Sequence, residues 1–281
     1  MNSLKLADNR QLVWHEWGAL DGRVVIFCPG AGMAGRFVFG ERDAEELNLR
    51  MISVDRAGLG GSDADPQKTL ASWTQDIEQL LNHLEAEAPL AIGFSQGAVF
   101  AYALAAVNLV EALTIVSGQD ELSHPAVIKQ LPDSVAVMVE RANSDKLALE
   151  TEIAQFATAE WLWQMIETMS AEQDRAYYAQ GDFAPHYRVA LDAGFVQGAA
   201  GYARDTILAM APWPFKLEEI NCPVQLWYGL ADTSPVHSPD FGETLSKRLP
   251  CVKLNQIESS GSAVLWTQSR EILMQLAAGK Y

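Results

Sequence analysis

Short apolar runs and amphipathic stretches alternate along the first 118 residues of the chain. Residues 4–17 predict an opening hairpin, with its turn at Asp8 and Asn9. The following apolar runs are unbroken, as in strands that are buried on both faces of a sheet. These strands are expected at residues 23–28, 48–55, 89–94 and 112–117. Apolar residues recur at helical spacing in two stretches between the strands, residues 70–85 and 98–107.

The alternation stops at Gly118 and returns near Pro212. The stretch between them predicts helices only. The strand pattern then resumes, and it predicts strands at 224–228 and 252–257 and helices at 241–249 and 263–277. Strands that alternate with helices indicate an α/β fold, a mostly parallel sheet with helices on both faces. We therefore expect a core formed by residues 1–118 and 213–281, with residues 119–212 inserted as a helical lid.

Composition narrows the class of protein. The formal net charge is −16 over 281 residues, so nucleic acids and anionic membrane surfaces are unfavourable partners. The three cysteines form no CxxC pair, which fits a reducing, cytoplasmic environment and predicts neither a disulfide framework nor a metal site. No signal peptide or membrane-spanning segment is visible, and no motif calls for a cofactor. A small molecule is the expected partner, and the sequence is compatible with a homodimer.

The pentapeptide Gly93-Phe94-Ser95-Gln96-Gly97 stands between an apolar strand and an apolar helix. In this context G-x-S-x-G predicts a nucleophile elbow, a sharp turn that exposes a serine hydroxyl above the sheet. The turn forces the serine into a strained backbone conformation, so only small residues fit two positions away on either side. The start of the following helix would also stabilise negative charge that develops near the serine.

Three more loops follow predicted strands and should meet at the same edge of the sheet. The first, Pro29 to Gly32, is rich in small residues, so that Gly30 would let the backbone approach a substrate carbonyl closely. The second places Asp232 directly after the strand at 224–228. The third runs from Glu258 to Ser262.

These loops, together with the segment 55–62 (Asp-Arg-Ala-Gly-Leu-Gly-Gly-Ser), resemble the α/β-hydrolase family over nearly the whole chain. The resemblance implies that Ser95 is the nucleophile and Asp232 the acid that orients the base. It also implies an oxyanion hole formed by the backbone N–H groups of Ala31 and Gln96.

Two positions depart from the family pattern. The family usually has His-Gly at the oxyanion loop, where this chain has Pro29-Gly30; this matters little if the N–H of Ala31 supplies the donor, because the Pro29 side chain does no chemistry. The second departure concerns the base. The family's base is the histidine of a Gly-His pair before the last helix, and this chain has Gly261-Ser262 there. A serine hydroxyl has no basicity near neutral pH and cannot carry a proton from nucleophile to leaving group. The resemblance therefore describes a hydrolase scaffold whose base is missing at Ser262, and it predicts a gap between Ser95 and Asp232 where the imidazole of the family lies.

Other residues remain candidates for the missing roles. His124, His186 and His237 are alternative bases. His237 lies only five residues after Asp232 and is also expected to contact the substrate. Asp120 is the second candidate for the acid. His15 and His83 lie on the opening hairpin and on an amphipathic helix, where surface histidines are common. Aromatic and methionine side chains of the lid, Trp161 among them, would form either an apolar roof over the substrate or the packing of the lid itself.

Two functional hypotheses follow. The first is a serine hydrolase that acts on an ester, thioester or small amide through an acyl-enzyme at Ser95, impaired by Ser262. The second is a catalytically silent relative that binds an apolar ligand in the same pocket. A lyase is a third and weaker hypothesis. Dehalogenase or epoxide-hydrolase chemistry is disfavoured, because it needs a carboxylate at position 95.

Overall fold

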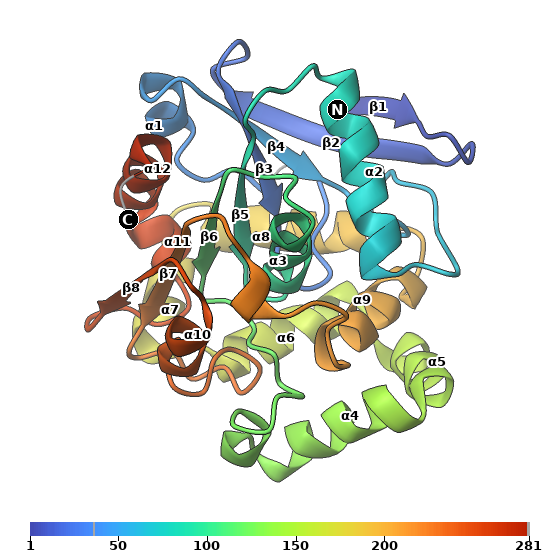
Figure 1. The fold of residues 1–281 in the computed structure, drawn as a ribbon. Coiled ribbons are helices and arrows are strands. Elements are labelled where there is room, and N and C mark those ends of the chain that lie inside the picture. Colours follow the sequence, from blue (N-terminus) through green and yellow to red (C-terminus); the bar gives the residue numbers. More distant parts are fainter. Residues whose placement is uncertain (36, 280–281) are drawn as a thin grey trace.

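The computed structural model describes residues 1–35 and 37–279, and it contains one sheet with helices on both faces (Figure 1). The strand order is β1-β2-β4-β3-β5-β6-β7-β8. β1 pairs with β2, and β2 with β4, in antiparallel orientation, and every other neighbouring pair is parallel. The strands are β1 (Asn2–Lys5), β2 (Gln11–Gly18), β3 (Arg23–Cys28), β4 (Leu49–Val54), β5 (Leu90–Phe94), β6 (Ala112–Val116), β7 (Val224–Gly229) and β8 (Val252–Ile257). The predicted α/β class is confirmed.

Alternate side chains of each buried strand point to opposite faces of the sheet. In β3, Val24 and Ile26 pack in the same cluster as α2 (Leu70–His83) and α3 (Gly97–Ala106). Val25 and Phe27 pack with α1 (Glu41–Glu46) and α12 (Ser269–Ala278) on the other face. Since both faces are covered, the strand carries no exposed apolar side and its sequence is continuously hydrophobic.

Six of the described α-helices lie between β6 and β7 in the sequence. They are α4 (Asp133–Ser144), α5 (Lys146–Phe156), α6 (Ala159–Met169), α7 (Glu172–Tyr178), α8 (Phe183–Gly194) and α9 (Ala200–Met210). Figure 1 shows α4 and α5 on the outside, beyond α6 and α9. The helical character of this segment was predicted. Its treatment as a separate lid stays a prediction.

The remaining differences from the sequence prediction are local. The helix predicted at 263–277 is divided into α11 (Val264–Thr267) and α12, with a break at Gln268. Helix α10 is shorter than predicted and spans Glu243–Arg248. Helix α1 was not predicted, because Glu-Arg-Asp-Ala-Glu-Glu buries only Ala44 and shows no apolar periodicity.

A buried ion network joins the helical segment to the core. Asp205 of α9 accepts hydrogen bonds from Arg56, at 2.6 Å, and from Lys68, and all three side chains are almost completely buried. Arg56 also donates to the carbonyl oxygens of Pro29 (2.7 Å) and Gly30 (3.0 Å). The network therefore fixes the loop after β3 against α9.

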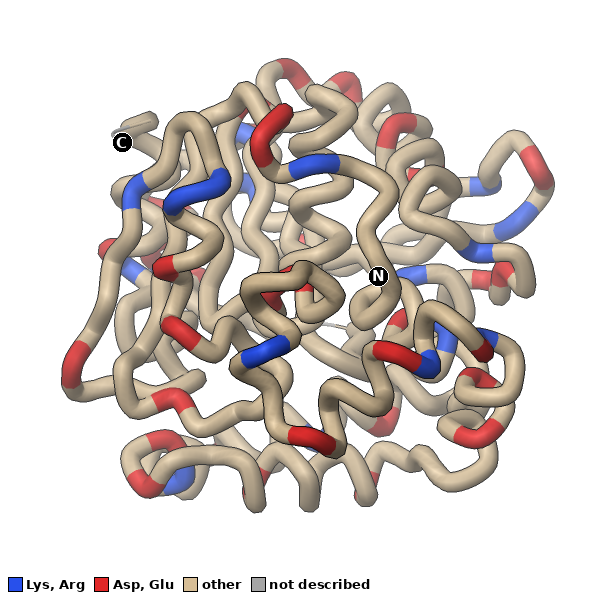
Figure 2. The backbone as a smooth tube through the Cα atoms, turned by 60° about the horizontal axis from the view of Figure 1, so that its bottom comes forward, with Lys and Arg blue, Asp and Glu red and all other residues tan. Residues whose placement is uncertain are grey.

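Charged positions lie mainly on helices and loops. Figure 2 shows acidic and basic positions interspersed over this side of the molecule, with no large basic surface. Within the described residues, no helix combines the length and the apolarity needed to cross a membrane.

Candidate active site

The turn after β5 has the strained geometry of a nucleophile elbow. Ser95 has a φ of +51°, a region that non-glycine residues rarely occupy. A Cβ atom on Gly93 would lie 2.8 Å from the Cα of Ala98, and one on Gly97 would lie 2.0 Å from the carbonyl oxygen of Cys28. Neither position has room for a side chain. The local conformation predicted from the pentapeptide is therefore present.

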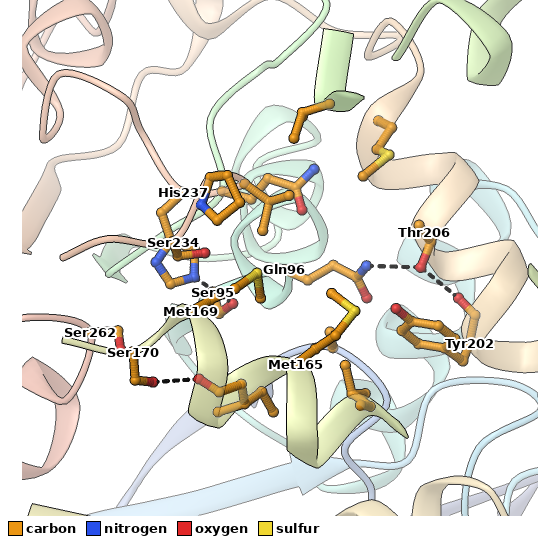
Figure 3. Close-up of a pocket in the computed structure, with 18 of the residues that line it drawn as sticks. Ser95, Gln96, Met165, Met169, Ser170, Tyr202, Thr206, Ser234, His237 and Ser262 are labelled. Carbon is orange, nitrogen blue, oxygen red and sulfur yellow. Dashed lines mark hydrogen bonds between the residues drawn. The ribbon is translucent and has the colours of Figure 1, made fainter. Parts of the chain in front are cut away.

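A continuous chain of hydrogen bonds runs from Ser95 to Asp232 through His237. The Oγ atom of Ser95 lies 2.8 Å from Nε2 of His237, and Nδ1 of His237 lies 2.7 Å from Oδ2 of Asp232. Figure 3 shows the imidazole of His237 beside Ser95. The carboxylate can only accept, so in a neutral imidazole the proton is on Nδ1 and the lone pair of Nε2 faces the serine hydroxyl.

Asp232 and His237 lie in one loop after β7. The side chains of Asp232 and His237 are only 4% and 8% exposed. The second carboxylate oxygen, Oδ1 of Asp232, accepts the backbone N–H of Ser234 at 2.9 Å, which holds the carboxylate in place. The prediction that no imidazole lies between Ser95 and Asp232 is therefore wrong. His237, expected only as a substrate contact or an alternative base, occupies that gap.

Ser262 has a different set of partners. Its backbone N–H and its hydroxyl both donate to Oδ2 of Asp174, at 2.8 and 3.0 Å, and the N–H of Ala263 donates to Oδ1 at 3.1 Å. The hydroxyl also lies 3.2 Å from that of Tyr178. A buried carboxylate on α7 thus anchors the loop after β8. Asp174 was not singled out in the sequence, since an acidic residue in a helical stretch gives no sign that it is buried.

The other candidates are not joined to Ser95 by a hydrogen bond. His83 and His186 are exposed, while Nε2 of His15 lies 3.8 Å from a carboxylate oxygen of Asp55. His124 accepts the backbone N–H of a nearby residue at 3.3 Å.

Asp120, the second candidate for the acid, is bonded elsewhere. Its Oδ2 accepts the hydroxyl of Ser238 at 2.8 Å, and its Oδ1 accepts the backbone N–H of Glu121. Burial raises the pKa of Asp120 to about 6. The carboxylate therefore contacts Ser238, the residue after His237, but it makes no hydrogen bond to the imidazole.

The two predicted oxyanion donors, Ala31 and Gln96, line the same cavity as Ser95. Within the described part of the chain, neither backbone N–H donates to a protein acceptor. The preceding carbonyl groups are held by Arg56, so the backbone before Ala31 is fixed. Gly30, predicted to contact substrate, is not among the residues that line the cavity.

The cavity has a volume of about 380 Å³ and an apolar lining. Helices α4, α6 and α9 contribute Met138, Trp161, Met165, Met169 and Met210 to it. None of its described lining residues carries a formal charge at neutral pH apart from the ionisable His237. Across residues 1–35 and 37–279, no cluster of three or more His, Cys, Asp or Glu side chains is placed to hold a metal ion. The site therefore suits a neutral ligand with substantial apolar surface.

The fold agrees with the comparison to known proteins. A model of the alpha/beta hydrolase family matches residues 25–273, and the chain belongs to this family. No curated protein gives a significant match.

Several solved structures are similar to this chain over its length. A hydrolase from Pseudomonas aeruginosa PA01 has a TM-score of 0.71 at 17% identity, covering 99% of this chain and 98% of its own. An esterase from Exiguobacterium antarcticum has a TM-score of 0.66 at 17% identity, with coverages of 98% and 97%. An enol-lactonase from Burkholderia xenovorans LB400 has a TM-score of 0.69 at 14% identity and covers 99% of both chains. At these identities the similarity concerns the fold.

Proposed function

We propose that this protein is a serine hydrolase that cleaves a neutral ester, thioester or small amide through an acyl-enzyme at Ser95. His237 acts as the general base and Asp232 orients it. The observation that carries the proposal is the unbroken hydrogen-bond chain from Asp232 through His237 to Ser95, which ends at an apolar cavity. Nucleophile, base and orienting acid within hydrogen-bond reach are the signature of an activated serine.

In the first half of the reaction, the Oγ atom of Ser95 attacks the substrate carbonyl carbon. The hydroxyl proton passes to Nε2 of His237, and the carbonyl oxygen becomes an oxyanion that accepts the N–H groups of Ala31 and Gln96. The bond to the leaving group then breaks, and the leaving alcohol, thiol or amine takes the proton from Nε2. Asp232 stabilises the imidazolium throughout.

Water completes the cycle. It attacks the acyl carbon, gives one proton to Nε2 of His237, and the tetrahedral intermediate collapses to release the carboxylic acid. Ser95 recovers its proton from the imidazolium. Both halves use one base and one pair of oxyanion donors, so Ser262 has no chemical role in this mechanism.

The cavity indicates the acyl side of the substrate. Methionine and aromatic side chains surround it, and unbranched methionine side chains adapt to ligands of irregular shape. A carboxylate or ammonium group on the substrate would lose its hydration without meeting an opposite charge, which is unfavourable. We therefore expect uncharged acyl groups of short to medium length.

A direct experiment compares the wild type with Ser95→Ala in hydrolysis of p-nitrophenyl butyrate. Incubation with a fluorophosphonate, followed by peptide mass spectrometry, identifies the labelled residue. The proposal requires turnover that is lost in Ser95→Ala and a label on Ser95. Equal rates in both proteins and no label on Ser95 would contradict it, and would favour a silent ligand-binding relative.

A further inference from the structure

Two buried amide side chains line the cavity and leave hydrogen-bonding atoms without protein partners. They are Gln96, 6% exposed, and Gln119, 2% exposed. Oε1 of Gln96 and Nε2 of Gln119 are both buried and unpartnered. We infer that these two groups form a polar subsite, which binds an uncharged donor–acceptor group, a hydroxyl or a secondary amide, on the acyl chain of the substrate. The inference rests on the proposed function and extends it.

The orientation of the Gln96 amide follows from its neighbour. The hydroxyl of Thr206 donates its only hydrogen to the carbonyl oxygen of Tyr202, at 2.9 Å. Toward Gln96 it can therefore only accept, so the amide presents Nε2 to it, at 3.2 Å. Figure 3 shows the side chain of Gln96 reaching across the pocket toward Thr206. Oε1 is thus left as an acceptor that needs a donor.

Gln119 is fixed next to the nucleophile. It follows β6, and its backbone N–H donates to the carbonyl oxygen of Ser95 at 3.0 Å. Its side-chain amide forms no hydrogen bond to any described residue, although the side chain is almost fully buried. A buried amide donor without an acceptor is unfavourable, and polar groups left in this way in native proteins usually meet ligand or water. The backbone of Gln119 is therefore held beside the nucleophile, in the lining of the same cavity.

The pair of groups defines the chemistry that would satisfy it. Oε1 of Gln96 requires an N–H or O–H donor, and Nε2 of Gln119 requires an acceptor such as an oxygen atom. A hydroxyl or a secondary amide on the acyl chain provides both, whereas a plain alkyl chain provides neither. A site that is built to hydrogen-bond a substrate group discriminates against the analogue that lacks it, because its own polar groups then remain unpaired.

Three methyl esters of equal chain length test the inference: methyl pentanoate, methyl 3-hydroxypentanoate and methyl N-acetylglycinate, with hydrolysis followed in a pH-stat. The quantity compared is the ratio of kcat/KM for each polar ester to that for methyl pentanoate. In Gln119→Met and Gln96→Met we expect this ratio to fall by about 10-fold or more for at least one polar ester. The ester whose ratio falls identifies the group bound, hydroxyl or amide.

Gln225→Met is the matched control. Gln225 is also fully buried with an unpartnered Nε2, but it lies on β7 and does not line the cavity. We expect this variant to keep the wild-type ratios. Ratios that stay unchanged in both Gln96→Met and Gln119→Met would overturn the subsite and mean that ordered water satisfies the two amides.

A binding measurement separates this outcome from failure of the hydrolase proposal. Ligand-observed NMR compares N-acetylglycinamide, 3-hydroxypentanamide and pentanamide with the Ser95→Ala protein and with the same protein carrying Gln119→Met. We expect a polar amide to bind more tightly than pentanamide, and this difference to disappear with Gln119→Met. If no ester is cleaved but the binding difference is seen, the subsite stands and the hydrolase proposal fails. If esters are cleaved but neither the kcat/KM ratios nor binding respond, the hydrolase proposal stands and the subsite fails.

Discussion

Removal of the His237 imidazole is the sharpest test of the proposed chemistry. The ring is in hydrogen-bond contact on both sides, 2.8 Å from Ser95 and 2.7 Å from Asp232, so His237→Ala removes the proton carrier and separates the acid from the nucleophile. In a serine protease, loss of the equivalent group costs about 10⁶-fold in kcat. We expect a loss of about 10⁴- to 10⁶-fold here, or about 5 to 8 kcal/mol of transition-state stabilisation.

The assay is the hydrolysis of p-nitrophenyl butyrate under saturating conditions, with circular dichroism as a check on folding. His186→Ala is the matched control, since that imidazole is exposed and is not bonded to Ser95. Added imidazole should restore part of the activity of His237→Ala, because the vacated volume adjoins the cavity. The control variant should show no such response.

Ser262→His provides the opposing test. If the base belonged at position 262, this substitution would raise the rate at least a hundredfold. We expect no increase, because His237, the proposed base, already faces Ser95 and because the larger ring must fit against Asp174 and Tyr178. A His237→Ala rate within tenfold of the wild type, or a large gain in Ser262→His, would refute the assignment of His237 as the base.

Three further predictions concern the groups around the site. Asp232→Asn should lower kcat for the same ester by about 10⁴-fold, because the amide favours the wrong imidazole tautomer. Asp174→Ala leaves the N–H groups that it accepts unsatisfied, and should lower the free energy of unfolding in urea by about 2 to 4 kcal/mol. Glu219→Gln, at an exposed ion pair, is its control and should have no measurable effect. The pKa of Asp120 is raised to about 6, so its contribution to stability is complete below the unfolded pKa of 3.8 and is lost as pH rises through about 6. Asp120→Asn should therefore reduce the fall in unfolding free energy between about pH 4 and about pH 7 by about 2 to 3 kcal/mol; an unchanged pH dependence would contradict the burial argument.

The sheet and the elbow could be predicted because their constraints are local. Continuous apolar runs are what a doubly covered strand requires, and Gly93 and Gly97 are small because Ala98 and Cys28 approach them closely. Asp232 was found for a similar reason, since it directly follows a recognisable strand. These features are encoded within a few consecutive residues.

The proposed base, His237, could not be assigned from the sequence because its position depends on the path of a loop. Nothing in residues 232–237 has a periodic pattern, and the five-residue spacing alone does not show that the ring turns back between Asp232 and Ser95. The contact of Asp174 with the loop at Ser262 joins residues 88 positions apart, which periodicity also cannot show. The unpaired amides of Gln96 and Gln119 emerge only when cavity and partners are seen together.

The position of Asp232 and His237 in a single loop affects how substitutions elsewhere in the protein should change the alignment of the site. A triad drawn from three distant loops loses its alignment when any one of them shifts, whereas two members of the triad proposed here are separated by only four residues. Under the proposed mechanism the loop after β8 carries no group that transfers a proton; its Ser262 lines the cavity and is bonded to Asp174 of α7. Substitutions that break the contacts of this loop with Asp174 should weaken the attachment of α7 without removing any group of the proposed proton transfers.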